Sequence, residues 1–219
     1  MADTKISWAN KVWNPVSGCS KISAGCKNCW AERMSKRLAG RFGYPKDDPF
    51  KITLHPDKLH EPLKWKKPQR IFVCSMADLF HVAVRWQDIN SVWLIMQQMK
   101  QHEFIILTKR PKRLMLWTQI AAYAKQWPIN EIWPDNVILG VSVEDQKTAD
   151  ERIPILLQIP ATKRFVSVEP MLGAINLYQY FWTAGGEKTH CIDQVICGGE
   201  TGHNARPLHP DWVRSLRDQ

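Results

Sequence analysis

Short apolar runs and longer stretches of helical periodicity alternate along the chain from about residue 68 onward. The runs are rich in β-branched and aromatic residues and lack strict alternation, which is typical of parallel strands covered on both faces. The predicted strands span residues 70–75, 103–108, 136–142, 163–168 and 193–197. The predicted helices span about 86–101, 113–126 and 147–158, with a last helix opening near Pro210. A less regular stretch follows residue 168.

The first 40 residues supply one more strand and helix. A strand around Ile6–Trp13 leads into a cysteine-rich loop, and a helix covers about Ala31–Leu38. Residues 40–69, rich in Pro, Gly and Lys, form a long basic connection or a small insert. We therefore expect a single domain over residues 1–219, built from six strand–helix units around a parallel sheet. The last helix reaches Gln219 without a capping residue, which predicts a chain truncated at its C-terminus.

Polar residues follow each of the six predicted strands. Six units form either an open doubly wound sheet or a partial barrel, and both architectures place function at the carboxyl ends of the strands. Beyond the cysteine loop, the candidate site residues at these ends are Ser75, Asp78, Lys109, Arg110, Ser142, Glu144, Glu169 and Glu200. Structural alternatives exist, since Asp78 can cap a helix and Glu144 can pair with a nearby lysine. Together these residues predict a cluster of polar side chains at the carboxyl ends of apolar strands.

Three of the six cysteines fall in one loop, where Cys19, Cys26 and Cys29 have the spacing C-x6-C-x2-C. Three thiolates can hold three irons of a [4Fe–4S] cluster and leave the fourth iron open for chemistry. Gly18 and Gly25 allow the loop to turn tightly around such a body. The spacing therefore favours an open iron–sulfur cluster.

Two alternatives to a cluster are open for these cysteines. A structural zinc would take Cys74 or His81 as its fourth ligand, although the chain has no second close pair of cysteines. A disulfide within the loop would leave one thiol over. The N-terminus has no signal-peptide pattern, which predicts a reducing cytoplasm, where clustered cysteines more often bind metal or catalyse.

The composition describes a globular protein with a basic first third. Hydrophobic residues make up 44% and charged residues 23% of the chain, and no apolar run is long enough to cross a bilayer, so we expect a cytoplasmic protein without membrane contact. Residues 1–70 carry the whole net charge of +9, with 15 Lys and Arg against 6 Asp and Glu. This excess indicates a nucleic acid or another polyanion as partner, or serves solubility. Trp65, between lysines, can stack on a base. Four histidines are expected at the surface: His55, His60, His203 and His209.

Longer motifs are spread over the whole chain. Those in the first half are Trp13–Cys19, the cysteine loop, Asp57–Trp65, Ser75–Phe80 and Leu107–Pro111. Those in the second half are Gly140–Asp145, Ser167–Pro170, Gly198–Glu200 and Ala205–Pro207. With these motifs the chain resembles the phage- and prophage-associated three-cysteine-motif family, which is of unknown function. That family is similar in turn to the radical S-adenosylmethionine enzymes.

The resemblance implies a fold, two cofactors and a reaction. The implied fold is a partial (β/α)6 TIM-like barrel of parallel strands, of the radical S-adenosylmethionine type, with the cluster loop after the first strand. The implied cofactors are a [4Fe–4S] cluster on Cys19, Cys26 and Cys29 and S-adenosylmethionine, served by an external electron donor. The implied reaction is reductive cleavage of S-adenosylmethionine to a 5′-deoxyadenosyl radical that acts on an unknown substrate. A nucleic acid or nucleotide is the leading substrate class.

The resemblance also suggests which strand ends contact S-adenosylmethionine. The candidates are Ser75 and Asp78 for the amino group, Lys109 or Arg110 for the carboxylate, Ser142 and Glu144 for the ribose, and Glu169 and Glu200 for cofactor or substrate. The superfamily spacing is C-x3-C-x2-C, so the first gap here is three residues longer. Asn28 stands where the superfamily has an aromatic residue before the third cysteine. Trp30 takes the adenine-stacking role or packs the following helix.

A non-enzymatic protein is the alternative from another functional class. Such a protein would bind nucleic acid through residues 1–70 and keep a structural iron–sulfur or zinc site. The polar residues at six strand ends argue against it, because a structural metal requires none of them. A protein partner is also open, and the sequence sets no oligomeric state.

Overall fold

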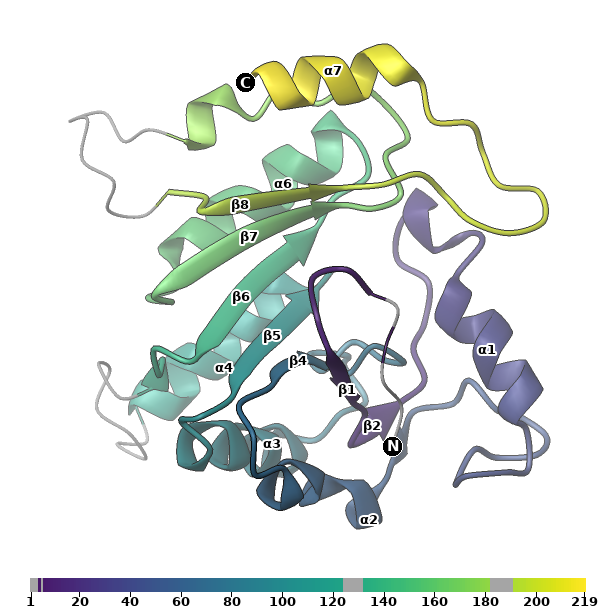
Figure 1. Ribbon diagram of the computed structural model, residues 1–219, viewed down its shortest axis with the longest axis vertical. Helices are drawn as coiled ribbons and strands as arrows, with labels where there is room; N and C mark the ends of the chain where they lie inside the picture. Colours follow the sequence, from purple (N-terminus) through teal and green to yellow (C-terminus); the bar gives the residue numbers. More distant parts are fainter. Residues whose placement is uncertain (1–3, 5, 124–131, 182–190) are drawn as a thin grey trace.

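Six parallel strands form one sheet whose strand order follows the chain (Figure 1). The computed structural model describes residues 4, 6–123, 132–181 and 191–219. The strands are β1 (Lys11–Trp13), β4 (Arg70–Val73), β5 (Glu103–Thr108), β6 (Val137–Ser142), β7 (Lys163–Val168) and β8 (Gln194–Cys197). A doubly wound sheet reverses its strand order at a switch point, whereas a barrel adds each strand beside the last. The sequential order therefore confirms the expected partial barrel.

Three long helices cover the outer face of the sheet. They are α3 (Trp86–Gln98), α4 (Pro111–Tyr123) and α6 (Gln146–Gln158), and each follows a strand of the sheet. A capping box starts α6, in which the side chains of Asp145 and Thr148 bond each other's backbone N–H groups. The helix expected from Arg113 begins two residues earlier, because Pro111 suits a first helical turn. Residues 124–126 of that expected helix lie outside the described residues.

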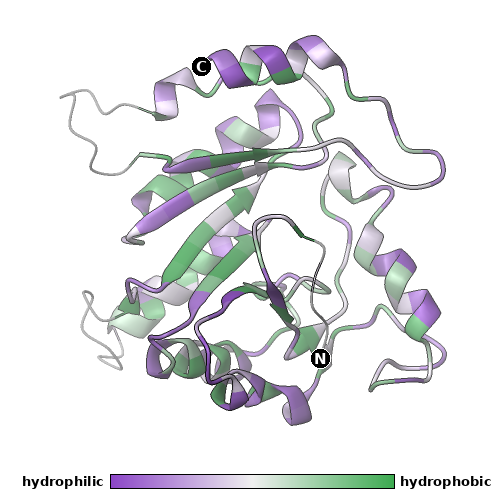
Figure 2. Ribbon diagram, in the orientation of Figure 1, coloured by the Kyte–Doolittle hydropathy of each residue, from purple (hydrophilic) through white to green (hydrophobic). Residues whose placement is uncertain are grey.

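The main apolar core lies between the outer face of the sheet and these helices. Figure 2 shows the strands coloured as hydrophobic along most of their length. Trp93 lies at the centre of an aromatic group, with its ring centroid 4.6 Å from Trp117 and 4.8 Å from Trp133. These three tryptophans therefore stabilise the fold rather than contact a ligand.

The inner, concave face of the sheet is covered by the N-terminal segment. Trp8 packs onto this face, with its ring centroid 4.7 Å from Phe72 and 6.2 Å from Phe165. The chain turns at residues 7–8 to place Trp8 there. The strand expected over Ile6–Trp13 is therefore limited to β1, Lys11–Trp13.

Residues 40–69 contribute short elements beside the cysteine loop. The strand β3 (Thr53–Leu54) pairs antiparallel with β2 (Val16–Ser17). The short helix α2 (Pro56–Leu59) and a 3-10 helix over Glu61–Lys64 follow it. This segment therefore packs against the start of the cysteine loop through a two-stranded ribbon.

Two expectations about surface residues in this segment are wrong. His55 is buried, because its imidazole Nε2 forms a hydrogen bond of 2.7 Å with the Ser17 hydroxyl. Trp65 is also buried, with its ring centroid 6.0 Å from that of His102, so its indole is not available to stack on a base. His60, His203 and His209 are exposed, as expected.

Two further helices lie at the ends of the strands and at the edge of the sheet. The helix α1 (Trp30–Leu38) follows the cysteine loop, and α7 (Pro210–Asp218) lies beside β8 (Figure 1). Across the described parts of the chain, every helix is too short or too polar to span a bilayer.

Candidate functional site

The cysteine loop lies at the carboxyl ends of the strands (Figure 1). It runs from β2 to α1, on the side toward which the strands of the sheet point. Gly18 opens the loop with a φ of +89°, and a Cβ there would come within 2.2 Å of the Lys51 carbonyl oxygen. Glycine alone tolerates both this conformation and this close approach, so the turn into the loop requires glycine at position 18.

Arg110, which follows β5, holds the first cysteine. Its Nη1 lies 3.5 Å from the Cys19 sulfur and 3.0 Å from Asp78 Oδ2, and its Nη2 donates to the Ser20 carbonyl at 3.0 Å. Asp78 also accepts a hydrogen bond of 3.0 Å from the backbone N–H of Lys109. Burial and the Asp78 carboxylate raise the pKa of Cys19, although Arg110 acts in the opposite direction. The first cysteine therefore lies beside a fixed ion pair.

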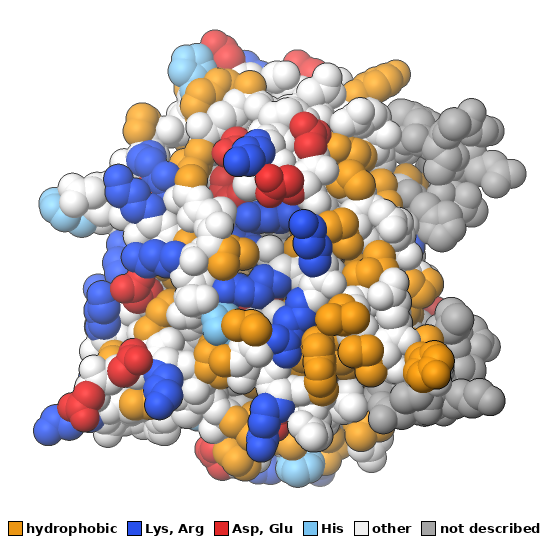
Figure 3. Space-filling model, turned by 180° about the vertical axis from the view of Figure 1, so that it is seen from behind, with side chains coloured by type: hydrophobic (Ala, Val, Ile, Leu, Met, Phe, Trp, Pro, Cys, Tyr) orange, Lys and Arg blue, Asp and Glu red, His pale blue; other side chains and the backbone are white. Residues whose placement is uncertain are grey.

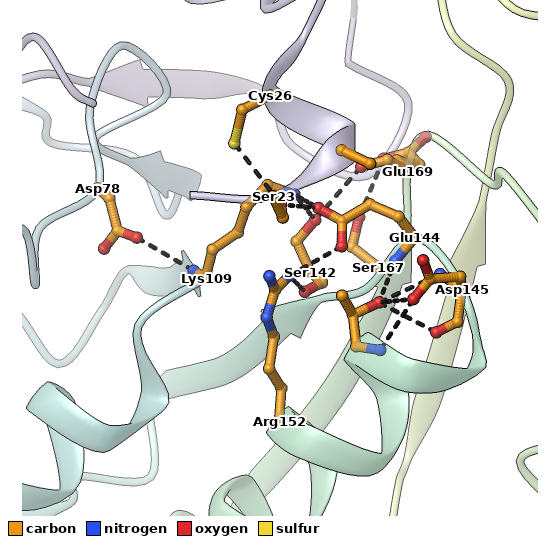
Figure 4. Close-up of polar contacts among 12 residues, drawn as sticks. Ser23, Cys26, Asp78, Lys109, Ser142, Glu144, Asp145, Arg152, Ser167 and Glu169 are labelled. Atoms are coloured by element: carbon orange, nitrogen blue, oxygen red, sulfur yellow. Dashed lines mark hydrogen bonds and ion pairs between the residues drawn. The ribbon is translucent and has the colours of Figure 1, made fainter. Parts of the chain in front are cut away.

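Glu144, which follows β6, contacts the middle of the cysteine loop. Its side chain is 0% exposed, accepts from the Ser23 hydroxyl, and forms ion pairs of 3.1 Å with both Lys109 Nζ and Arg152 Nη1 (Figure 4). A Cβ on Gly25 would come within 2.4 Å of this side chain, so the 3-10 turn of the loop rests directly on it. Burial raises the pKa of Glu144, but Lys109, Ser23 and Arg152 outweigh it and lower the pKa overall. The buried carboxylate is therefore ionised at neutral pH.

Glu200 and Arg206, from the segment after β8, hold the last part of the loop. Asn28 donates to Glu200 Oε2 at 2.8 Å, and Arg206 donates to the same oxygen at 3.0 Å and to the Ala24 carbonyl at 2.9 Å. The hydrogen bonds from Arg206 lower the pKa of Glu200 to about 2. We call the contacts around Asp78–Arg110, around Glu144 and around Glu200–Arg206 the three tethers of the cysteine loop.

The three loop cysteines are free, half-buried thiols. None of the three forms a disulfide in this structure. Burial raises the pKa of Cys26, but backbone hydrogen bonds at Ile22 and Ser23 and the charge of Lys109 outweigh it and lower the pKa overall. The thiolate is the form that binds metal, so the loop favours metal binding at this position.

The arrangement of the thiols bears on the zinc alternative. Within the described ranges, no three Cys, His, Asp or Glu side chains gather closely enough to hold one ion. Ligands of one zinc all lie about 2.0–2.3 Å from it, whereas each cysteine of a cubane cluster binds a different iron. Burial raises the pKa of Cys74, a candidate fourth zinc ligand, to about 12. The other candidate, His81, forms a hydrogen bond of 2.7 Å with the Ser20 hydroxyl.

Of the other predicted residues, Ser142 and Glu169 contact the tethers. Ser142 accepts from Lys109 Nζ at 2.5 Å and donates to the Glu169 carbonyl at 3.3 Å, which joins the ends of β5, β6 and β7. Ser75 lies apart and donates to Asn14 Oδ1 at 3.2 Å. Trp30, at the start of α1, is 50% exposed, so packing of that helix does not bury its ring.

Several side chains of the tethers were not anticipated from the sequence, namely those of Ser20, Ser23, Asn28, Arg152 and Arg206. Arg206 lies inside the Ala205–Pro207 motif, which is a signal that could have pointed to it. Arg152 lies on the buried stripe of α6 between Ala149 and Ile153, and an arginine in an apolar stripe is a second such signal.

Known proteins match this chain in sequence family and in fold. The family model described as "Protein of unknown function (DUF5131)" matches residues 3–219. A solved structure described as "Spore photoproduct lyase complexed with dinucleoside spore photoproduct" has a TM-score of 0.51 at 11% identity, over 77% of this chain and 48% of that one. A point mutant of spore photoproduct lyase gives 0.47 at 11% identity, with the same coverage. None of the curated proteins matches the sequence.

The structural likeness concerns the fold. The chain spans about half the length of the spore photoproduct lyase that it matches, at 48% of that chain. Because the identity is 11%, the match bears on the arrangement of strands and helices and on nothing finer. It confirms the expected fold class, a six-stranded parallel sheet with helices between the strands.

Proposed function

The chain belongs to the DUF5131 family of proteins of unknown function, and we propose that it is an iron–sulfur enzyme of the radical S-adenosylmethionine type. The observation that carries this proposal is the position of the cysteine loop. Three free thiols are held at the carboxyl end of a six-stranded half-barrel by side chains that follow β5, β6 and β8. A structural metal needs no such convergence, whereas a reactive centre at the mouth of a barrel does.

Cys19, Cys26 and Cys29 would each give one thiolate to a [4Fe–4S] cluster. The chemistry supplied there, with an electron from an external donor, is reductive cleavage of S-adenosylmethionine to a 5′-deoxyadenosyl radical that removes hydrogen from a substrate. The chain's own residues bind, orient and shield the reactants.

Lys109 is the cation best placed to bind the carboxylate group of S-adenosylmethionine. Its side chain is 19% exposed and is oriented by Glu144 and Ser142, at 3.1 and 2.5 Å from its Nζ. Arg110, the other candidate, is 12% exposed and already contacts Asp78 and Cys19. Arg110 therefore serves the loop, while Lys109 keeps donor capacity for a ligand.

The remaining contacts follow from the same geometry. Glu144 is committed to Lys109, Arg152 and Ser23, so Ser142 is the better candidate of the pair for a ribose hydroxyl. Ser75 remains the candidate for the amino group, because its partner Asn14 is neutral and can be exchanged for a ligand. Asp78, which shares that assignment, is buried against Arg110.

Anaerobic reconstitution with iron and sulfide tests the proposal. We expect the reconstituted protein, given dithionite and S-adenosylmethionine, to release 5′-deoxyadenosine. The variant Cys26→Ala should lose both the cluster absorbance and this product. The matched control is Cys197→Ala, which removes a half-buried cysteine outside the loop and should keep both. A tightly held stoichiometric zinc with no product from the native chain would contradict the proposal.

A further inference from the structure

A cavity of about 340 Å³ opens on the inner face of the sheet. Its apolar lining residues include Trp8, Phe72 and Leu107, and its polar lining residues are Ser7, Ser167 and Glu169. Ser7 is exposed, Ser167 is buried and the others are half-buried, so the cavity is accessible from solvent. Its volume falls in the lower part of the range of small-molecule sites, about 300–1,000 Å³.

Glu169 differs from the other acidic residues at the strand ends. Asp78, Glu144 and Glu200 each form an ion pair with an arginine or lysine. Considering the described ranges alone, Glu169 forms no ion pair, and its Oε2 accepts a hydrogen bond of 3.2 Å from the Ser167 hydroxyl. A carboxylate offers about four acceptor positions. The Glu169 carboxylate therefore has acceptor positions left for a ligand in the cavity.

A short chain of polar contacts links this cavity to the cysteine loop (Figure 4). The Glu169 carbonyl accepts from the Ser142 hydroxyl at 3.3 Å, and Ser142 accepts from Lys109 at 2.5 Å. Lys109 pairs with Glu144, which in turn accepts from Ser23 of the loop. The cavity is therefore connected to the cysteine loop through residues at the carboxyl ends of β5, β6 and β7.

We propose that this cavity binds a nucleobase that carries an exocyclic amino group. Trp8 and Phe72 supply aromatic surface for a flat ring, and base–aromatic stacking tolerates any base. Glu169 selects among the bases, because a carboxylate only accepts hydrogen bonds and therefore favours a base that presents N–H donors. The basic first third of the chain suits the phosphates of a nucleotide.

The donor pattern of each base sets an order of preference. Guanine presents two adjacent donors, N1–H and the 2-amino group, which match the two oxygens of a carboxylate. Adenine and cytosine present one amino group beside a ring acceptor. Uracil and thymine present a single N–H between two carbonyl oxygens, which a carboxylate repels. The inference rests on the proposed function, because the base belongs either to S-adenosylmethionine or to a nucleotide substrate.

Isothermal titration of the full-length, metal-free protein with five nucleosides tests the site. Guanosine should bind most tightly, followed by adenosine and cytidine, with uridine and thymidine weakest. The variant Trp8→Ala should weaken binding of all of them by roughly five- to a hundredfold, as loss of one stacking partner does. Trp8→Phe should retain binding, and Trp212→Ala, which removes a half-buried tryptophan outside the cavity, is the matched control.

The variant Glu169→Gln tests the selection itself. An amide both donates and accepts, so this variant should lose the preference for guanosine and gain affinity for uridine, whose N–H and carbonyl it can match. A structural role for Glu169 would weaken all five nucleosides alike and leave their order unchanged. The matched control is Glu103→Gln, at the opposite end of the sheet, which should bind as the native chain does. Equal affinity for all five nucleosides, or an unchanged order in Glu169→Gln, would overturn the proposal.

Competition with S-adenosylmethionine identifies the source of the base. Displacement of guanosine by S-adenosylmethionine assigns the cavity to the adenosyl group, and simultaneous binding assigns it to a base of the substrate. The titration needs neither iron nor reductant. Failure of nucleoside binding and failure of the proposed radical chemistry are therefore separate results.

Discussion

The carboxylate of Glu144 is the most deeply buried charge beneath the cysteine loop. Its side chain is 0% exposed and lies between Lys109 and Arg152. A buried charge is tolerated where cations and hydrogen-bond donors surround it, and the Ser23 hydroxyl adds such a donor from the loop itself. Glu144 is therefore a positioning residue that ties the loop to β6 and α6.

Removing this carboxylate should destabilise the whole molecule. We expect Glu144→Ala to lower the free energy of unfolding by about 3–5 kcal/mol, because Lys109 and Arg152 would be left without their shared partner. Urea denaturation monitored by circular dichroism measures the change. The control Glu151→Ala removes an exposed carboxylate from the same helix and should stay within about 0.5 kcal/mol of the native chain. A loss of similar size in both variants would contradict this account of the buried group.

His55 should make stability fall at mildly acid pH. Burial lowers the pKa of His55, and the nearby charge of Lys58 adds to the effect against Asp57. The folded-state pKa therefore lies below the unfolded value of about 6.5, and the unfolded chain binds more protons in acid. The stability contributed by neutral His55 is fully present above the unfolded pKa. It is lost as the pH falls from the unfolded pKa toward the folded pKa.

Denaturation at a series of pH values measures this effect. The variant His55→Gln should flatten the stability profile between about pH 7 and 5 relative to the native chain. The control His60→Gln, at an exposed histidine nearby, should keep the native slope. Equal slopes in the native chain and in His55→Gln would show that another group carries the pH dependence.

At the scale of elements, the 3-10 turn over Ala24–Cys26 is seated on Glu144 with no room for a side chain at Gly25. We expect Gly25→Ala to lift the turn, speed hydrogen exchange in residues 23–29, and lower the iron bound on reconstitution. Exchange in the sheet should stay as in the native chain. The control Gly173→Ala adds a Cβ that would lie 3.8 Å from Asp145, an ordinary contact. Unchanged exchange in residues 23–29 would contradict the tight seating of the turn.

The strands were predictable because the sequence marks them strongly. The predicted bounds of β5 and β7 coincide with the observed ones, since each has an apolar centre, Phe104–Leu107 in β5 and Phe165–Val166 in β7, flanked by polar residues. The shortening of β1 was not predictable, because Trp8 turns onto a concave face that exists only once the sheet is built. The burial of Trp65 likewise depends on His102, 37 positions away in the chain.

The position of the candidate site was predictable from the sequence, but the pairing of its side chains was not. Parallel strands bring their carboxyl ends to one edge, so Asp78, Lys109 and Glu144 were expected near one another. Which cation meets which carboxylate depends on side-chain conformations that carry no sequence pattern. The structure was therefore needed to show that Arg152 of α6 pairs with Glu144 and that Arg206, after β8, pairs with Glu200.

At the scale of the whole molecule, charge is unevenly distributed. Figure 3 shows Lys and Arg side chains interspersed with Asp and Glu on one face of the molecule. Along the chain, the excess of positive charge comes from residues 1–70. The exposed lysines of this segment include Lys64, Lys66 and Lys67. We propose that these lysines contact the phosphates of a single-stranded nucleic acid.

Salt dependence tests this partner. We expect the affinity for single-stranded DNA to fall with salt, and joint substitution of Lys64, Lys66 and Lys67 by Ala to reduce the slope of log affinity against log salt by about 2. Fluorescence anisotropy at several salt concentrations measures the slope. Joint substitution of Lys100, Lys112 and Lys147, exposed lysines outside the basic third, should change it less. An affinity independent of salt would remove the nucleic-acid partner.

The tethers of the cysteine loop join residues that are far apart along the chain. Asn28 and Glu200 are separated by 172 positions, and Ala24 and Arg206 by 182. Contacts of such separation form late in folding, because most of the chain must be ordered before they can close. During synthesis Arg206 leaves the ribosome 177 residues after Cys29. Iron and sulfide delivered before that point would meet an untethered loop, so we expect cluster assembly to follow the synthesis and folding of the segment that contains Arg206.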